Sequence, residues 1–190
     1  LDGWNEAVIA RTIAAAIPNE TALFVSSSRP IRDLEGFAVP RSGVVTYANR
    51  GLAGIDGNIS TALGIAHSHK ATVAILGDLS FLYDLTGLIQ KEDINCRFIV
   101  INNDGGGIFS TLPQRGSHGF ETVFGTPHGL NPAEIAKSMG VSAKQISSLK
   151  ELEAEIKSPI SGISVVVCDV PDRESNADNL IAIYDSLKSF

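Results

Sequence analysis

The sequence predicts an α/β domain in three layers, with a mostly parallel sheet of about six strands flanked by helices. Two observations lead to this class. Short apolar, β-branched runs alternate with longer segments whose apolar residues recur at helical spacing, which is the pattern of βαβ units. The central runs are apolar at almost every position, as in strands that are buried on both faces of a parallel sheet.

The first quarter of the chain predicts a helix, two strands and a loop between them. Apolar residues recur at helical spacing over 4–17, and the run 22–25 is a strand. We expect 26–32 to be a polar loop, because Pro30 has no N–H with which to continue a ladder. The run 44–47 is a second strand.

The middle of the chain repeats the strand and helix pattern twice. Asn58 is placed to cap a helix over 58–66, and 72–76 is a third strand. Ser80 is placed to cap the next helix, and 98–101 is a fourth strand. The apolar residues of that helix expected to face the sheet are Leu82, Leu85, Leu88 and Ile89.

The second half predicts a long loop followed by further helices and strands. The segment 113–129 has no clear period and contains four glycines and two histidines, so we expect a functional loop that is mobile in the isolated chain. The elements after it are a helix from Asn131 to Gly140, a short strand near 143–146, a helix that follows the Ser148–Glu151 capping box, a strand over 163–170 and a helix near 180–187.

Composition limits the classes of function. A chain of 190 residues, 44% hydrophobic and 19% charged, predicts one globular domain over 1–190. The net charge of -6 argues against nucleic-acid and anionic-membrane surfaces, which need basic patches. Cys96 and Cys168 fall in apolar runs, which favours buried free thiols. Free thiols indicate a reducing compartment, and no apolar run is long enough to span a bilayer, so we expect a cytoplasmic location.

Two polar segments, 77–80 and 102–107, each follow an apolar strand. Asn103 lies 25 residues after Asp78, about the length of one helix and one strand, so both side chains are expected at the same edge of the sheet. Carboxylate, amide and carbonyl oxygens are ligands that suit Mg²⁺. Taken singly, each segment fits a structural reading, in which Asp78 caps a helix and 103–105 form a turn.

Together the two segments resemble the thiamine-diphosphate-binding motif, Gly-Asp-Gly followed by Asn-Asn. The resemblance implies the thiamine-diphosphate-binding fold, which is Rossmann-like. It also implies a Mg²⁺ ion, or Mn²⁺, held by Asp78, Asn103 and the carbonyl of Gly105. Leu79 departs from the motif, where glycine is usual. The other cofactor contacts that it implies are Ile55, Gly77, Leu79 and Ser80.

Leu79 and the tail Gly-Gly-Gly-Ile-Phe at 105–109 resemble one branch of this family, 2-succinyl-5-enolpyruvyl-6-hydroxy-3-cyclohexene-1-carboxylate synthase of menaquinone biosynthesis. The segments 28–33, 49–57 and 124–129 agree with that branch. These transferases decarboxylate 2-oxoglutarate and add the succinyl unit to isochorismate. The resemblance implies the C-terminal third of a longer enzyme, a homodimer or homotetramer with active sites shared between subunits, and Leu1 in place of Met is consistent with a fragment.

The resemblance also implies a set of substrate contacts. Both substrates are dicarboxylates, which arginine pairs with bidentately. The implied carboxylate contacts are Ser28, Arg32 and Arg50, and the implied apolar wall is Ile108 and Phe109. Without the resemblance, the two arginines would be surface ion pairs and the apolar residues would be core. Arg29 matches no part of the family pattern.

No catalytic residue is assigned in this chain. In the family a glutamate on a separate pyrimidine-binding domain activates the cofactor, and no segment here matches that domain. We therefore expect the isolated chain to be inactive, and we assign no role to its histidines. Two alternatives remain open: another thiamine-dependent 2-oxo acid decarboxylase or carboligase, and a non-catalytic Rossmann-like nucleotide-binding module. The second is weakened because no strand is followed by Gly-x-Gly-x-x-Gly.

Overall fold

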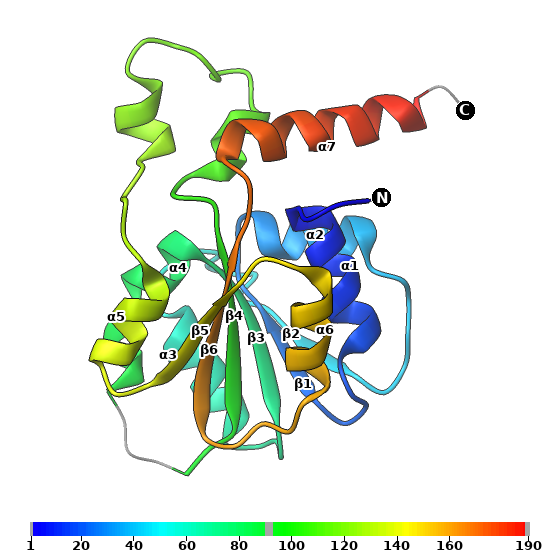
Figure 1. Ribbon diagram of the computed structural model, residues 1–190, viewed down its shortest axis with the longest axis vertical. Helices are drawn as coiled ribbons and strands as arrows, with labels where there is room; N and C mark the ends of the chain where they lie inside the picture. The colour runs from blue at the N-terminus through cyan, green and yellow to red at the C-terminus, as the bar shows by residue number, and fades with distance from the viewer. Residues whose placement is uncertain (1, 90–92, 189–190) are drawn as a thin grey trace.

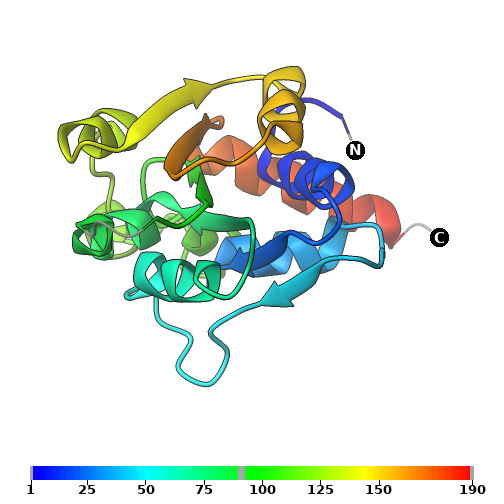
Figure 2. The ribbon, with the colours of Figure 1, turned by 90° about the horizontal axis from the view of Figure 1, so that it is seen from below.

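The computed structural model describes residues 2–89 and 93–188. Their strands form a six-stranded sheet in the order β2-β1-β3-β4-β6-β5, and every neighbouring pair is parallel (Figures 1 and 2). The predicted fold class is therefore confirmed. The strands are β1 (Ala22–Val25), β2 (Val45–Tyr47), β3 (Thr72–Gly77), β4 (Cys96–Asn102), β5 (Ser142–Ile146) and β6 (Ile163–Asp169).

Helices cover both faces of the sheet, and apolar side chains fill the two spaces between the layers. In β4, Ile99 packs toward one helical layer and Phe98 toward the other, and both are fully buried. One layer contains α1 (Glu6–Ala16), α2 (Arg29–Phe37) and α6 (Leu149–Lys157). The other contains α3 (Asn58–Ala66), α4 (Asp78–Tyr83) and α5 (Pro132–Ser138).

The segment after β1 is a helix, so the prediction of a loop over 26–32 is wrong from residue 29 onward. Proline is tolerated in the first turn of a helix, where its missing N–H has no intrahelical partner. Pro30 occupies that position in α2, and the buried side chains of Pro30, Asp33 and Phe37 follow helical spacing. Pro30 therefore marks the start of a helix.

Two of the predicted caps are also wrong. Gly57 caps α3 in a left-handed conformation, while the buried Asn58 side chain donates to the carbonyl oxygens of Gly54 and Asp56. The next helix begins at Asp78, two residues before Ser80. By contrast, Asn131 and Ser148 cap α5 and α6 as predicted.

The structure has two shorter elements where one helix was predicted between Ser80 and Ile89. α4 ends at Tyr83, and a 3₁₀-helix, η1, covers Leu85–Leu88. Leu88 is buried, but Ile89 is 75% exposed and does not face the sheet, which corrects that part of the prediction. Asp84 accepts hydrogen bonds from the backbone N–H and the hydroxyl of Ser60, so its role is to hold α3 against this turn.

The long loop and the last helix lie beyond the carboxyl ends of the strands (Figure 1). A 3₁₀-helix, η2 (Gly107–Thr111), follows β4, and one turn of π-helix, η3 (Glu121–Gly125), interrupts the predicted loop. α7 (Arg173–Leu187) passes over η2. These segments cover the edge of the sheet at which the carboxyl ends of the strands lie (Figure 1).

The structure also shows the state of the two cysteines and the lengths of the helices. Cys96 and Cys168 are free and buried, in β4 and β6, and burial raises the pKa of Cys96 to about 12. Across residues 2–89 and 93–188, no helix has the length and apolar character needed to cross a bilayer.

The strand order reverses direction between β1 and β3. The chain goes outward from β1 to the edge strand β2, and then returns past β1 to build β3, β4 and the far side of the sheet. In open parallel sheets, ligands bind at such a switch point, outside the carboxyl ends of the strands. The segments that follow β1, β3 and β4 meet there.

Candidate functional site

A cleft of about 160 Å³ opens at this switch point. It is bounded by the segments that follow β1, β3 and β4 and by the turn before α3. Ten of the twelve residues predicted for the site line it. They are Ser28, Ile55, Gly77, Asp78, Leu79, Ser80, Asn103, Gly105, Ile108 and Phe109.

Asp78 joins the ends of β3 and β4. Its side chain is buried, and Oδ1 accepts the N–H of Leu79 at 2.6 Å. Oδ2 accepts the N–H of Asn103 at 3.2 Å and that of Gly105 at 2.9 Å. Backbone donors thus hold the carboxylate in place and compensate its burial. The two segments that predicted a site from the sequence are therefore in direct contact.

His128 reaches this carboxylate from the long loop. Its Nε2 lies 3.2 Å from Asp78 Oδ2, and its Nδ1 accepts the backbone N–H of Leu130 at 3.0 Å. Because Nδ1 accepts, Nε2 carries the proton that is donated to Asp78. The hydrogen bond to Asp78 raises the pKa of His128 above its ordinary value. The sequence contains no signal for this contact, because the two residues are 50 positions apart.

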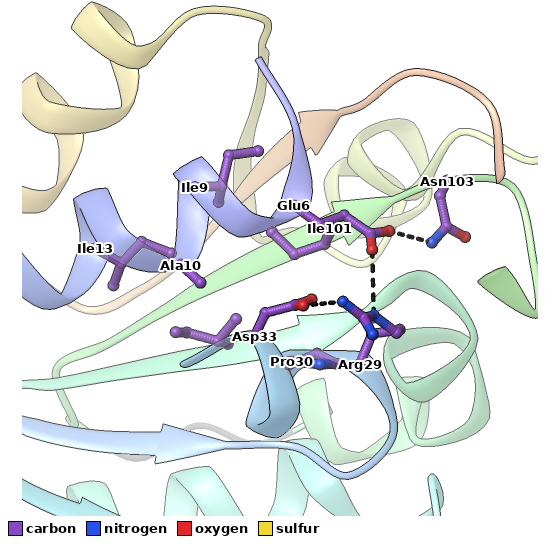
Figure 3. Close-up of a pocket in the computed structure, with 11 residues that line it drawn as sticks. Glu6, Ile9, Ala10, Ile13, Arg29, Pro30, Asp33, Ile101 and Asn103 are labelled. Atoms are coloured by element: carbon purple, nitrogen blue, oxygen red, sulfur yellow. Dashed lines mark hydrogen bonds and ion pairs between the residues drawn. The ribbon is translucent and has the colours of Figure 1, made fainter. Parts of the chain in front are cut away.

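The carboxamide of Asn103 has two different environments. Its Nδ2 donates to Oε1 of Glu6 at 2.6 Å (Figure 3). Its Oδ1 is buried and has no hydrogen-bond partner among the described residues. A buried carbonyl oxygen without a partner is costly, and such an atom at a binding site marks a position for a ligand.

Glu6 belongs to a buried charged cluster beside the cleft, which was not predicted from the sequence. Arg29 contacts both carboxylates of the cluster: its Nε lies 3.6 Å from Oε2 of Glu6, and its Nη2 is paired with Asp33 (Figure 3). Burial raises the pKa of Glu6, and it raises the pKa of Asp33 to about 7. The sequence contained no clear signal for this cluster, because Arg29 was expected in a loop and the structure places Arg29 and Asp33 one turn apart in α2.

The glycines after β4 allow the long loop to approach closely. Gly105 has φ of 132°, and a Cβ at this position would lie 2.2 Å from the carbonyl oxygen of Gly125. A Cβ at Gly106 would lie 2.1 Å from the carbonyl oxygen of Phe124. The N–H of Gly106 donates to the Gly125 carbonyl at 2.7 Å. Gly105 and Gly106 are therefore required by packing against η3.

Apolar and hydroxyl groups complete the cleft. The Ser80 hydroxyl donates to the carbonyl oxygen of Ile55 at 2.9 Å, which fixes the turn before α3 at the cleft. Ile108 and Phe109 lie in η2, and the Phe109 ring contacts that of Phe124 at 5.3 Å between centroids. One wall is thus apolar and is packed against the loop.

Arg32 and Arg50 do not line the cleft. Both are exposed, and Nη1 of Arg32 donates to the carbonyl oxygen of Ser28 at 2.8 Å. Their roles at substrate carboxylates remain predictions. The arginine that lines the cleft is Arg29, the one that matched no family pattern.

Oxygen atoms suited to a hard cation are present on three residues that line the cleft. They come from the Asp78 carboxylate, the Asn103 amide and the Gly105 carbonyl, which accepts only the N–H of Gly107 among the described contacts. Within the described ranges, no three His, Cys, Asp or Glu side chains form a group that could hold a metal. A cation here would therefore depend on amide and carbonyl oxygens.

The sequence of this chain is similar to those of known proteins. Residues 36–170 match the family model described as "Thiamine pyrophosphate enzyme, C-terminal TPP binding domain". The 2-succinyl-5-enolpyruvyl-6-hydroxy-3-cyclohexene-1-carboxylate synthase of Thermobifida fusca is 43% identical over 156 residues, covering 78% of this chain and 28% of the relative. The synthase of the same name from Bacillus cytotoxicus is 40% identical over 198 residues, covering 96% and 34%.

A solved structure shares the fold. An enzyme from Mycobacterium smegmatis, assigned as thiamin diphosphate-dependent, superposes with a TM-score of 0.67 at 21% identity, covering 88% of this chain and 32% of that one. The chain spans about a third of the length of each of these proteins. The resemblance predicted from the sequence is confirmed: this chain belongs to the family of C-terminal TPP-binding domains of thiamine pyrophosphate enzymes.

Proposed function

We propose that this chain is the diphosphate- and metal-binding part of a 2-succinyl-5-enolpyruvyl-6-hydroxy-3-cyclohexene-1-carboxylate synthase. Such an enzyme decarboxylates 2-oxoglutarate and adds the succinyl unit to isochorismate. The observation that carries the proposal is the cleft itself, in which the two motif segments and the apolar wall lie together. The similarity to synthases of this name extends over most of the chain.

The residues present fit thiamine diphosphate held through Mg²⁺. The unpartnered, buried Oδ1 of Asn103 is the open position that a cation would fill, beside the carboxylate of Asp78. We assign Asp78, Asn103 and the Gly105 carbonyl as the metal ligands. Gly77, Leu79, Ser80 and Ile55 are assigned to the cofactor. When bound, thiamine diphosphate supplies the electron sink for decarboxylation.

The chain's own residues would position the reactants and exclude water. Ile108 and Phe109, supported by Phe124, give one wall low polarity, which strengthens electrostatic interactions in the cleft. Ser28, which follows β1, also lines the cleft. In this proposal, the group that activates the cofactor lies on another domain, so the isolated chain has no synthase activity. The working assembly is a homodimer or homotetramer.

Calorimetric titration of the isolated chain tests which class of cofactor it binds. Thiamine diphosphate with Mg²⁺ is expected to bind, weakly because half of the site is on another domain, and Asp78→Ala is expected to abolish that binding. Exposed Glu134 gives a matched control, Glu134→Gln. Binding of NAD in place of thiamine diphosphate would instead support a nucleotide-binding module.

A chimera tests the reaction. The matched third of the Bacillus cytotoxicus synthase is replaced by this chain, and folding is checked by size-exclusion chromatography and circular dichroism. Turnover of 2-oxoglutarate with isochorismate is expected from the chimera and not from the isolated chain. A folded chimera that accepts only pyruvate or an aldehyde in place of isochorismate would point to another thiamine-dependent carboligase.

A further inference from the structure

The side-chain amide of Asn103 has one preferred orientation, and Glu6 determines it. Arg29 beside Glu6 favours its ionised form, and a carboxylate only accepts hydrogen bonds, so the group that faces Glu6 is the Nδ2 donor. The 2.6 Å contact between Nδ2 and Oε1 is short, as expected for a charge-assisted bond. The opposite end of the amide, Oδ1, then necessarily faces away from Glu6 (Figure 3).

Glu6 is itself fixed. It lies in the first turn of α1, where Asn5 caps the helix by accepting the N–H of Val8. Its second oxygen, Oε2, lies 3.6 Å from Nε of Arg29, and Arg29 is paired in turn with Asp33 on α2. The side chains of Glu6, Arg29 and Asp33 are all 12% exposed or less. The cluster therefore connects two helices to the end of β4.

We propose that Glu6 is a positioning residue that presents Oδ1 of Asn103 to the cation of the cleft. This inference rests on the proposed function, since it takes Asn103 as a metal ligand. Without an obligate acceptor at position 6, either end of the amide satisfies the contact, and the flipped amide would offer N–H groups to the cation. Arg29 supports this role by its contact with Glu6, and Asp33 supports it by its ion pair with Arg29.

The orientation is tested by nuclear magnetic resonance of the chain without ligand. In the wild type, one Nδ2 proton of Asn103 is expected to be shifted downfield and protected from exchange with solvent. Asn103→Asp identifies the resonance by its disappearance. In Glu6→Gln the shift and the protection are expected to be lost. The control Glu153→Gln, on the exposed part of α6, is expected to leave them unchanged.

The consequence for the cation is tested with Mn²⁺ and thiamine diphosphate, using paramagnetic broadening of cleft resonances as the readout. Glu6→Gln is expected to raise the Mn²⁺ midpoint at least about tenfold, and Asn103→Asp is expected to raise it too, because two carboxylates then face each other. The double variant combines Glu6→Gln with Asn103→Asp. The amide at position 6 then donates to the carboxylate at position 103, and the second oxygen of that carboxylate stays free for the cation. Its midpoint is expected to return to within about threefold of the wild type.

The outcomes separate the two proposals. If the Asn103 Nδ2 proton keeps its shift and its protection in Glu6→Gln, the positioning role is overturned. The same follows if the Mn²⁺ midpoint of the double variant is no lower than those of the single variants. If the wild type shows no Mn²⁺-dependent broadening, the role of Asn103 toward a cation is overturned together with the proposed function. This holds even if the spectrum without ligand shows the shifted, protected Nδ2 proton that indicates the contact with Glu6. Thermal denaturation of each variant distinguishes a local change from unfolding.

Discussion

His128 donates through Nε2 to Oδ2 of Asp78, the carboxylate that also accepts the N–H groups of Asn103 and Gly105. This contact connects the long loop to the ends of β3 and β4. Asp104 also holds the loop, because its Oδ1 accepts the backbone N–H groups of His128 and Gly129 at 3.0 and 2.7 Å. One acidic residue after each central strand therefore anchors the loop over the cleft.

Removing the Asp78 carboxylate is expected to destabilise the fold as well as the site. Asp78→Ala leaves the buried N–H groups of Asn103 and Gly105 without an acceptor, which costs about 1–3 kcal/mol for each unsatisfied group. Urea denaturation measures the loss, with Glu134→Ala as an exposed control. A midpoint equal to that of the wild type would show that the carboxylate does not hold the two strand ends together.

The His128–Asp78 contact predicts a loss of stability at alkaline pH. The contact raises the pKa of His128 in the folded state. Its stabilisation is therefore fully present below the unfolded pKa of about 6.5 and is lost as pH rises through the higher, folded value. Urea denaturation between pH 6 and pH 9 should show this loss in the wild type. In His128→Gln the free energy of unfolding should depend less on pH over that range. An unchanged pH dependence would show that the His128–Asp78 contact does not cause it.

Asp33 predicts a second dependence at lower pH. Burial raises the pKa of Asp33 from 3.8 to about 7, so the folded state retains this proton where the unfolded state has lost it. Stability is then expected to fall as pH rises from about 4 to 7, the reverse of the usual carboxylate behaviour. Asp33→Asn should flatten the denaturation profile in that window, and His128→Gln should leave that part of the profile unchanged.

Adding a methyl group at Gly106 is expected to displace the π-helical turn. The new Cβ would lie 2.1 Å from the Phe124 carbonyl oxygen, and overpacking of this kind costs about 1–3 kcal/mol. Gly36→Ala is the matched control, because a Cβ on α2 at that position meets nothing within 4 Å. Calorimetric melting should show a lower Tm for Gly106→Ala only. Equal melting of both variants would argue against tight packing of η3.

The long loop is expected to exchange unevenly in the isolated chain. We predict that amides of 113–119 exchange rapidly, because most of these residues are exposed. Amides near η3 should exchange more slowly, since Gly106 and Arg173 hold the Gly125 carbonyl. Hydrogen exchange with mass spectrometry resolves the two segments. Uniform protection across 113–129 would contradict the predicted mobility.

Local sequence patterns predicted most of the fold. Hydrophobic periodicity is a property of neighbouring residues, so it identified the six strands that the structure describes and the core face of most helices. It missed α2, because a proline in the first turn has the same appearance as one that ends a strand. It also extended the helix after β3 too far, since a 3₁₀ turn has similar apolar spacing.

The sequence by itself determined a mostly parallel sheet of about six strands, the two polar strand ends at Asp78 and Asn103, and the glycine run that follows Asp104. Only the tertiary structure decided what surrounds them. Glu6 and His128 are 97 and 50 residues from their partners in the site, and no local pattern encodes contacts at such separations. A buried charge is tolerated only where a partner compensates it, so a charged side chain acquires its role when the fold supplies that partner.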